Sequence, residues 1–419
     1  MKVIQVFEHE RLRVGEKRNG VVFTEAHFFA LSKLNERHGN GFFTMLHRGI
    51  RYSSYVGVVQ IPGLTIEILP KADNVPDRHY HLWRNVLIDM LMQCKVVNYS
   101  TMGAASLYLR RGSILDVYIA AFLEEVDTLC RQGLVRQYRP VEGNINYWKG
   151  RTHFAKHLRN HLIHQERVYA VHQVYDHHHR LNQILWQALR IIPGLTAQQA
   201  LLTHAQLLIN QFPELDNIPI TRSTFRHIQY DRNTSRYRNA IDNAQLLLCN
   251  YIPDLQYGTY HSFMLLFNMD SLFEAFVYQQ LKKVANQHGI QVNKQVSKTF
   301  WAQNKIRPDI VVYNKKSGKK YVIDTKWKKL RSHQPAAEDL RQMYVYNQYF
   351  NATKGLLLYP AVYPLSLKSE AFEKPEKLTE GVNYSENHCA LGFIDMLDEK
   401  GKLSREIGTE VMEMLASTE

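Results

Sequence analysis

From residue 307 the sequence reads Arg307-Pro308-Asp309-Ile310-Val311-Val312-Tyr313, and after residues 314–319 it continues Lys320-Tyr321-Val322-Ile323-Asp324-Thr325-Lys326-Trp327-Lys328. Two apolar runs flank a turn that contains Ser317-Gly318, which is typical of a β-hairpin. Because a strand alternates faces at every residue, Asp324 and Lys326 point to the same side. Asp309 opens the partner strand and is expected to face them. The hairpin therefore gathers two carboxylates and a lysine at one point.

These groups are suited to phosphodiester hydrolysis, which needs charge neutralised on the phosphate and a water made nucleophilic. We expect Asp309, Asp324 and the main-chain carbonyl of Thr325 to hold Mg²⁺. Lys326 is expected to orient the water or help to deprotonate it. The alternative is a surface hairpin with an ordinary Asp–Lys pair, because D-x-K by itself is a common pattern.

Two further polar residues flank the hairpin in sequence. Glu274 lies on an amphipathic helix that begins at Asp270, and we expect it to reach the metal or its waters if that helix packs along the sheet. A solvent-facing glutamate is the alternative. Gln342 lies on the helix that follows the hairpin and shares a helix face with Tyr346, four residues on. This face is predicted to look onto the same cleft.

Length and composition limit the class of protein. A chain of 419 residues predicts two or three domains. The 52 Lys and Arg residues exceed the 39 Asp and Glu residues, so the net charge is +13 and the pI about 9.4. A polyanion such as nucleic acid is the expected partner, and a soluble protein that is merely basic is the alternative. The four scattered cysteines form no C-x-x-C pair, and neither a secretion signal nor a run of about 20 apolar residues occurs, which indicates a cytoplasmic protein without a membrane span.

The pattern along the chain predicts an α+β protein with three regions. Residues 1–75 read as a β-rich domain with one helix, for which Thr24 is the N-cap. Residues 76–257 carry helical periodicity and form a helical region. Residues 258–419 alternate helix, strand, hairpin, helix and strand, which predicts an α/β/α domain with helices on both faces of a mixed sheet. Within it, 258–265 reads as a linker and 362–386 as an irregular, charged insertion.

Two other segments have binding potential. Residues 222–238 place basic side chains among aromatic ones, a pattern that fits phosphate contacts and base stacking, or else a solvated helix face. The candidate nucleic-acid contacts are Arg222, Arg226, Arg232 and Arg236, with Lys328 and Lys329 after the hairpin. A zinc site is conceivable on the helical face with His153, His157, His161 and His164, but its basic surroundings favour a polar surface. The chain contains neither G-x-x-x-x-G-K-[ST] nor G-x-G-x-x-G, so we expect no nucleotide site of those kinds.

The order Glu274, Pro308-Asp309, Asp324-Thr325-Lys326 and Gln342-x-x-x-Tyr346 resembles the PD-(D/E)xK nuclease superfamily. More narrowly it resembles McrC-like subunits of McrBC-type modification-dependent restriction systems. The stretches 267–274, 339–346 and 55–59 with 64–71 add to this likeness, which is strongest in 262–360. The resemblance implies a restriction-endonuclease-like C-terminal domain that cleaves double-stranded, methylcytosine-containing DNA with Mg²⁺. It also carries over Asp309, Asp324, Lys326, Glu274 and Gln342 as the catalytic set.

The resemblance further implies a separate partner, a hexameric McrB-like AAA+ GTPase that reads methylated DNA. The β-rich residues 1–75 are then expected to dock into the pore of that hexamer and stimulate GTP hydrolysis. Two alternatives stay open on the residues alone. One is a non-catalytic adaptor that activates the partner NTPase, and the other is a protein that binds RNA or DNA only by charge. An intact set of Asp309, Asp324 and Lys326 favours the nuclease.

Overall fold

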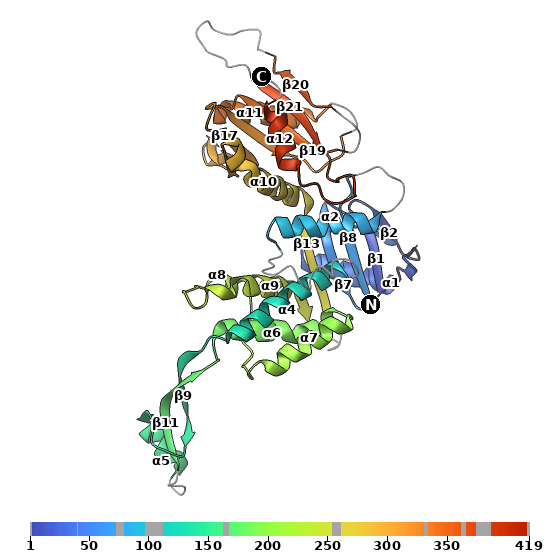
Figure 1. Ribbon diagram of the computed structural model, residues 1–419. Coiled ribbons are helices and arrows are strands. Elements are labelled where there is room, and N and C mark those ends of the chain that lie inside the picture. The colour runs from blue at the N-terminus through green and yellow to red at the C-terminus, as the bar shows by residue number, and fades with distance from the viewer. Residues whose placement is uncertain are drawn as a thin grey trace. The chain divides into compact units, whose positions relative to one another are not determined.

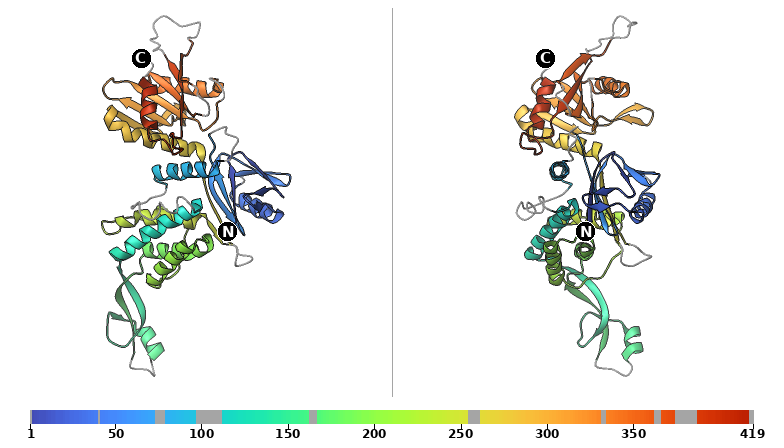
Figure 2. Two further views of the ribbon diagram at one scale, coloured as in Figure 1. Left: turned by 45° about the vertical axis from the view of Figure 1, so that its right-hand side comes forward. Right: turned by 90° about the vertical axis from the view of Figure 1, so that its right-hand side faces the viewer.

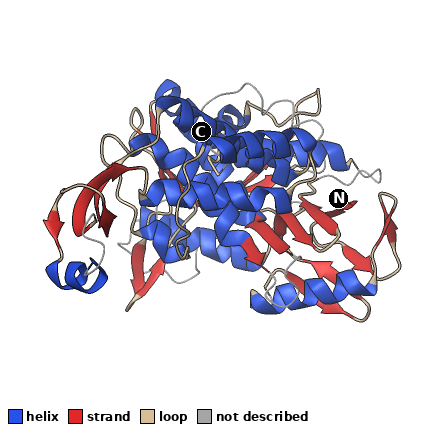
Figure 3. Cartoon of the chain, turned by 90° about the horizontal axis from the view of Figure 1, so that it is seen from below, coloured by secondary structure: helices blue, strands red, loops and turns tan. Residues whose placement is uncertain are grey.

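The computed structural model describes residues 2–39, 41–72, 79–96, 112–161, 167–253, 261–330, 334–361, 366–373 and 387–416. The chain divides into two compact units, one formed by residues 98–263 and the other by Lys2–Val97 together with Met264–Glu419. The N-terminal and C-terminal regions therefore belong to one unit. The chain contains both helices and strands (Figure 3), which confirms the predicted α+β class. All four cysteines are free thiols, and no helix in the described ranges is long and apolar enough to cross a membrane.

The N-terminal part of the two-segment unit is rich in short strands, as predicted. They are β1 (Lys2–Phe7), β2 (Arg11–Arg13), β3 (Lys17–Arg18), β4 (Val21–Val22), β5 (Phe43–Leu46), β6 (Gly49–Tyr52), β7 (Tyr55–Ile61) and β8 (Leu64–Leu69). Its helices are α1 (Glu25–Arg37) and α2 (Tyr80–Gln93). The predicted cap of α1 is confirmed, because the Thr24 side chain accepts a hydrogen bond from the backbone of His27.

Strands β1, β8 and β7 lie side by side, and β13 (His261–Asn268) is the next strand after β7. Gly57 makes this approach feasible, since a Cβ at its positive φ would meet the backbone oxygen of Leu265 at 2.2 Å. The prediction of a linker over 258–265 is therefore wrong from residue 261 onward, and residues 258–260 lie outside the described ranges. The chain leads into its C-terminal domain through a strand of the N-terminal sheet.

The C-terminal domain is built on a mixed six-stranded sheet of order β14-β17-β18-β19-β21-β20. Its strands are β14 (Ile290–Lys294), β17 (Ile310–Asn314), β18 (Lys320–Thr325), β19 (Lys354–Pro360), β20 (Lys368–Ala371) and β21 (His388–Ile394). Strands β18, β19 and β21 are parallel, whereas β14, β17 and β18 are antiparallel neighbours. The mixed sheet and its central hairpin are confirmed.

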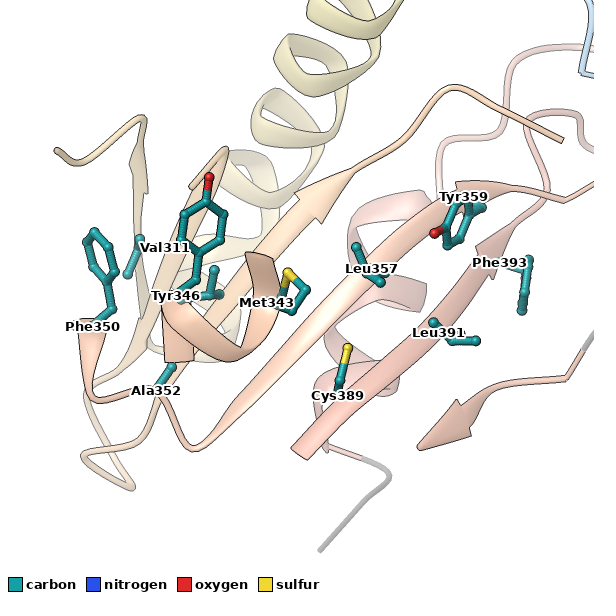
Figure 4. Close-up of a cluster of buried hydrophobic side chains, with 11 residues drawn as sticks. Val311, Met343, Tyr346, Phe350, Ala352, Leu357, Tyr359, Cys389, Leu391 and Phe393 are labelled. Atoms are coloured by element: carbon teal, nitrogen blue, oxygen red, sulfur yellow. The ribbon is translucent and has the colours of Figure 1, made fainter. Parts of the chain in front are cut away.

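Helices cover both faces of this sheet (Figure 2, right). Helix α10 (Met269–His288) packs with α12 (Ile407–Ala416), and Gly289 ends α10 in the left-handed conformation. Helix α11 (Ala337–Phe350) lies over β18 and β19. Its buried side chains form a cluster with those of the strands (Figure 4), composed of Val311, Val322, Met343, Tyr346, Phe350, Ala352, Leu357, Tyr359, Cys389, Leu391 and Phe393.

Two elements of this domain escape sequence analysis. Strands β15 (Lys298–Trp301) and β16 (Asn304–Ile306) form a separate hairpin between β14 and β17, and all four residues of β15 are exposed. Strand β20 (Lys368–Ala371) pairs with β21. The predicted irregular insertion at 362–386 is therefore wrong at β20, and residues 362–365 and 374–386 lie outside the described ranges. Both elements bury little apolar surface, so their sequences lack a clear strand pattern.

The other unit is built around a group of packed helices (Figure 1). These are α4 (Ile114–Gln132), α6 (Arg180–Leu195), α7 (Gln199–Gln211) and α9 (Arg238–Asn250), with the short α8 (Arg222–Arg226), the 3₁₀ turn η1 (Ser235–Tyr237) and strand β12 (Tyr251–Pro253). The apolar residues of α4 recur at helical spacing, and thirteen of its side chains are buried, consistent with a helix in the middle of the group. Gly133 follows α4 as its C-cap, with a positive φ.

The middle region is not purely helical, however. Strands β9 (Gln137–Ile145), β10 (Arg151–Thr152) and β11 (Val168–Asp176) form a three-stranded antiparallel sheet, and α5 (Phe154–His161) packs against β11. We call residues 137–176 the arm. Tyr237 and Asn182 anchor its base, because the Tyr237 hydroxyl donates to Asn182 Oδ1 at 2.9 Å and accepts from the Val135 backbone at 2.8 Å. Both side chains are fully buried, and Asn182 Nδ2 also donates to the His177 carbonyl at 2.9 Å, so this network fixes the chain just before and just after the arm.

Candidate active site

The register of the central hairpin brings Asp309 and Asp324 together. Ile310 pairs with Ile323 across β17 and β18. One residue further, the same register sets Asp309 opposite Asp324, and directly opposed residues of an antiparallel pair share a face. The positions predicted from the alternation of strand residues therefore meet as expected.

Asp309 is fixed by the strand that carries Asp324. Its Oδ2 accepts hydrogen bonds from the backbone N–H of Thr325 at 2.7 Å and from the Thr325 hydroxyl at 2.8 Å. The backbone carbonyl of Asp309 accepts from the N–H of Gln295 at 2.9 Å. Both hydrogen bonds to the side chain end on Oδ2. Strand β18 therefore orients the carboxylate, and neither of these bonds uses Oδ1.

Asp324 is a buried acid. Only 2% of its surface is exposed, and its Oδ2 lies 2.8 Å from Lys326 Nζ. The Lys326 ammonium therefore faces this oxygen, and its charge opposes the rise in the pKa of Asp324. Burial raises the pKa of Asp324 to about 6, and the neighbouring Asp309 carboxylate adds to the rise. A buried carboxylate beside a second carboxylate is a place where a cation would be stabilised.

Lys326 is the central cation of the site. Besides Asp324, its Nζ lies 3.5 Å from Asp339 Oδ1 and donates to Gln342 Oε1 at 3.3 Å. Burial by itself would lower the pKa of Lys326, but the carboxylates, led by Asp324, outweigh it and raise the pKa. The side chain therefore stays an ammonium group at neutral pH and is held from three directions.

Gln342 connects Lys326, through Tyr346, to the segment between β16 and β17. Its Nε2 donates to the Tyr346 hydroxyl at 2.6 Å, and that hydroxyl donates to the backbone carbonyl of Arg307 at 3.1 Å. Residues 342 and 346 thus use the shared helix face that the sequence predicts. The chain of contacts ties Lys326 to the segment just before Asp309.

Glu274 lies beside the site on α10. Its Oε1 accepts from Gln295 Nε2 at 2.9 Å and lies 3.6 Å from Lys294 Nζ. Burial, reinforced by the charge of Asp309, raises the pKa of Glu274 above its ordinary value. Glu274 is buried, so the solvent-facing alternative is wrong. Its role as a metal ligand or catalytic residue stays a prediction.

The donor set fits a hard cation that keeps most of its waters. Within the described residues no group of three or more His, Cys, Asp or Glu side chains is arranged to hold a metal. Mg²⁺ is commonly bound through one or two carboxylates and several waters. Asp309 and Asp324, with the Thr325 carbonyl between the second carboxylate and Lys326, match that requirement, and the opposition of the two carboxylates across β17 and β18 is the observation that favours it.

Sequence reasoning missed two supports of the site. Asp339 pairs with both Lys326 and Lys328, and it lies three residues before Gln342 on the same face of α11, a spacing that could have revealed it. Trp327, directly after Lys326, donates from Nε1 to Glu8 Oε1 at 2.6 Å, a bond between residues 319 positions apart. No local pattern signals a contact of that range.

The candidate nucleic-acid residues fall into different surroundings. Lys328 is paired with Asp339 beside the site, and Lys329 is exposed two positions from Trp327. In the other unit, Arg222, Arg226 and Arg232 are exposed. Arg236, also exposed, donates to the Gly133 carbonyl at 2.6 Å and so helps to satisfy the end of α4. The role of these residues in binding stays a prediction.

The histidines of the arm serve its backbone. His153 Nδ1 accepts from the N–H of Lys156 at 3.4 Å, and His157 Nδ1 accepts from the N–H of Tyr169 at 3.3 Å. His164 and the side chain of His161 lie outside the described residues. These contacts favour the polar-surface interpretation over zinc binding.

Comparison with known proteins identifies the family. The sequence matches the family described as "McrBC 5-methylcytosine restriction system component" over residues 50–360. The chain belongs to this family. No curated protein matches the sequence.

Two solved structures of Thermococcus gammatolerans share the fold. One is the half-complex of a tetradecameric assembly of McrB AAA+ hexamers with bound McrC, at 18% identity and a TM-score of 0.73, covering 99% of this chain and 100% of the other. The second is the cryo-EM structure of the McrBC complex, at 19% identity and a TM-score of 0.50, covering 67% and 88%. The fold of this chain is thus McrC-like along nearly its whole length, which bears out the resemblance seen in the sequence.

Proposed function

We propose that the chain is the Mg²⁺-dependent DNA endonuclease subunit of a McrBC-like restriction complex. The observation that carries this proposal is the meeting of Asp309, Asp324 and Lys326 at one end of a buried hairpin. The substrate is DNA containing methylcytosine, in keeping with the description of the family. The basic charge of the chain, net +13, favours a polyanionic substrate.

Each residue then has a distinct task. Asp309, Asp324 and the Thr325 carbonyl would hold the cation, which would supply charge neutralisation at the phosphate and lower the pKa of a water. Lys326 keeps its proton and places an ammonium group beside the phosphate and the attacking water. Gln342 and Asp339 keep that ammonium in position. The arrangement belongs to the PD-(D/E)xK type, with Glu274 as a neighbouring acid.

The partner is proposed to be a McrB-like AAA+ GTPase hexamer whose hydrolysis the chain stimulates, because the Thermococcus chain that shares this fold is bound to AAA+ hexamers. Residues 1–75 remain the predicted docking segment. The arm is a second candidate surface, since Tyr138, Tyr147, Trp148 and Phe154 are 63–75% exposed there. Exposed aromatic side chains in such number mark an interaction surface more often than a free one.

The deciding experiment compares Asp324→Asn with the unaltered chain, each mixed with the GTPase partner, methylated duplex DNA and Mg²⁺. Cleavage should fall by at least about 10²-fold, whereas stimulation of GTP hydrolysis should be unchanged. Asp216→Asn is the matched control, because Asp216 is 82% exposed and lies in the other unit. Cleavage that survives in Asp324→Asn would refute the active site. If the unaltered chain stimulates GTP hydrolysis but cuts no DNA, the chain is an adaptor instead.

A further inference from the structure

A groove of about 690 Å³ opens beside the candidate active site, between the β15–β16 hairpin and α11. Its volume falls within the range of sites for small organic groups, which is roughly 300–1,000 Å³. The residues that line it and matter here are Phe300, Lys305, Arg307, Arg341, Gln342 and Tyr346. None of these positions was among the predicted nucleic-acid contacts, and only Gln342 was predicted to act in catalysis.

The groove begins where the catalytic contacts end. Gln342, which accepts from Lys326 Nζ, and Tyr346, which donates to the Arg307 carbonyl, both line it. A molecule that fills the groove therefore lies next to the ammonium group of the D-x-K motif. The groove and the site share helix α11, which fixes their positions relative to each other.

The charge of the groove has one sign. Lys305, Arg307 and Arg341 are its ionisable cations, and the lining includes no carboxylate. Cations without paired acids attract a polyanion, and backbone phosphates are the anions that a nuclease must meet. The charge thus selects nucleic acid over an apolar or cationic occupant.

The hairpin adds aromatic faces to this charge. Phe300 is 46% exposed and Trp301 is 71% exposed, although a domain of this size has ample core in which to bury them. Lys298 fixes the hairpin to α11, because its Nζ donates to the Tyr349 carbonyl at 2.6 Å. The Phe300 ring lies 5.3 Å from that of Tyr349, so it is held in place while much of its face stays open. Bases stack on such rings only when they are unpaired, because a duplex hides its base faces.

Building on the proposed function, we propose that this groove binds unpaired nucleotides of the DNA strand next to the cleaved phosphodiester. A base stacks on Phe300, and the adjoining phosphates contact Lys305 and Arg341. The contacts are independent of sequence, since every base has a stacking face. Cleavage is consequently favoured where the two strands have separated.

The test measures binding and does not depend on cleavage. The full chain carrying Asp324→Asn is titrated, without the partner, against a fluorescein-labelled 12-nucleotide oligothymidine and against a blunt 20-base-pair duplex, followed by anisotropy. Phe300→Ala and Arg341→Ala should each weaken single-strand binding about tenfold and duplex binding less than about twofold. The controls are Phe29→Ala, an exposed ring outside the groove, and Lys315→Ala, an exposed cation of the β17–β18 turn.

A second readout reports stacking itself. A 2-aminopurine within the same oligonucleotide should be quenched on binding, the quenching should vanish in Phe300→Ala, and it should return in Phe300→Tyr. The groove proposal is overturned if the groove variants match the controls, or if single-strand and duplex binding weaken equally. The two proposals fail in different ways. If the groove variants match the controls in binding while a chain that keeps Asp324 still cuts DNA, only the groove proposal fails. Conversely, binding that needs Phe300 and Arg341 in a chain that cuts no DNA would leave the groove standing and remove only the nuclease assignment.

Discussion

The six-stranded sheet and the arm both contain an antiparallel pair of strands, but they treat their side chains in opposite ways. In β18, five of six residues are buried, and the acids at its end are held by named partners. In β9, no residue is buried, and exposed and half-buried positions alternate along all nine residues. Tyr138 and Tyr175 meet across the arm with ring centroids 4.7 Å apart, yet both remain largely exposed. The six-stranded sheet holds polar groups at fixed positions inside a core, whereas the sheet of the arm leaves apolar side chains exposed and available to a binding partner.

This difference separates two requirements of the proposed function. Chemistry needs a few groups at fixed positions in a place of low dielectric constant, which a covered sheet supplies. Recognition of a partner needs apolar area that the chain does not use for its own core. The predictions below alter one region at a time and ask whether the other responds.

The largest effect is expected at Lys326. Lys326→Gln removes the ammonium group that faces Asp324, so cleavage should fall by about 10²-fold or more while partner binding is unchanged. Lys328→Gln is the matched control, because Lys328 also pairs with Asp339, whereas the lysine that lies against Asp324 is Lys326. It should affect the DNA concentration needed for half-maximal cleavage more than the maximal rate. Single-turnover cleavage assays separate the two quantities, and equal losses in both variants would argue against a special role for Lys326.

The contact behind the site should make stability depend on pH. Burial raises the pKa of Glu8 from 4.5 to about 7, so the folded chain keeps a proton there that the unfolded chain releases. The stability from this group is full below pH 4.5 and is lost as pH rises through 7. Glu8→Gln still accepts a hydrogen bond from Trp327 but cannot ionise. Between pH 5 and pH 8 its free energy of unfolding should therefore rise, relative to that of the unaltered chain, by up to roughly 3 kcal/mol.

Urea unfolding at the two pH values measures this gain. Glu399→Gln, at an exposed position of the same unit, is the control and should follow the unaltered chain. A parallel pH dependence of Glu8→Gln and the unaltered chain would show that Glu8 does not carry a proton in the folded state.

A tenfold effect is expected when the arm is altered. Trp148 is 75% exposed, so Trp148→Ser should change the free energy of unfolding by no more than about 0.5 kcal/mol. If the arm contacts the GTPase, the affinity for that partner should fall about tenfold, as measured by calorimetric titration. Phe29→Ser tests the competing surface, because Phe29 is 62% exposed within residues 1–75. Weakening by Phe29→Ser alone would place docking on the N-terminal domain and not on the arm.

The smallest effect is expected at the edge of the site. Tyr346→Phe removes the hydroxyl that joins Gln342 to the Arg307 carbonyl. One hydrogen bond of this kind contributes about 1 kcal/mol, so cleavage should slow by roughly fivefold. Tyr349→Phe, on the exposed side of the same helix, should leave the rate unchanged. A loss as large as that of Lys326→Gln would mean that Tyr346 contacts the substrate directly.

The sequence was most informative where short-range rules govern the structure. Alternation along a strand sets Asp324 and Lys326 on one side, and the hairpin turn brings Asp309 to them. The caps at Thr24 and Gly289 follow from the same local physics. Patterns of burial failed for β9, β15 and β20, because strands that bury little need no apolar alternation. Their sequences contain no signal that distinguishes them from loops.

The sequence by itself thus determined the α+β class, the hairpin and the three residues proposed for catalysis, since each depends on neighbours a few positions away. Only the tertiary structure decided what surrounds them. It joined residues 2–97 to the C-terminal domain, set Glu8 against Trp327, placed Asp339 behind Lys326 and raised an aromatic hairpin over α11. Such contacts depend on how whole elements pack, and packing is a property of many residues at once that no single stretch encodes.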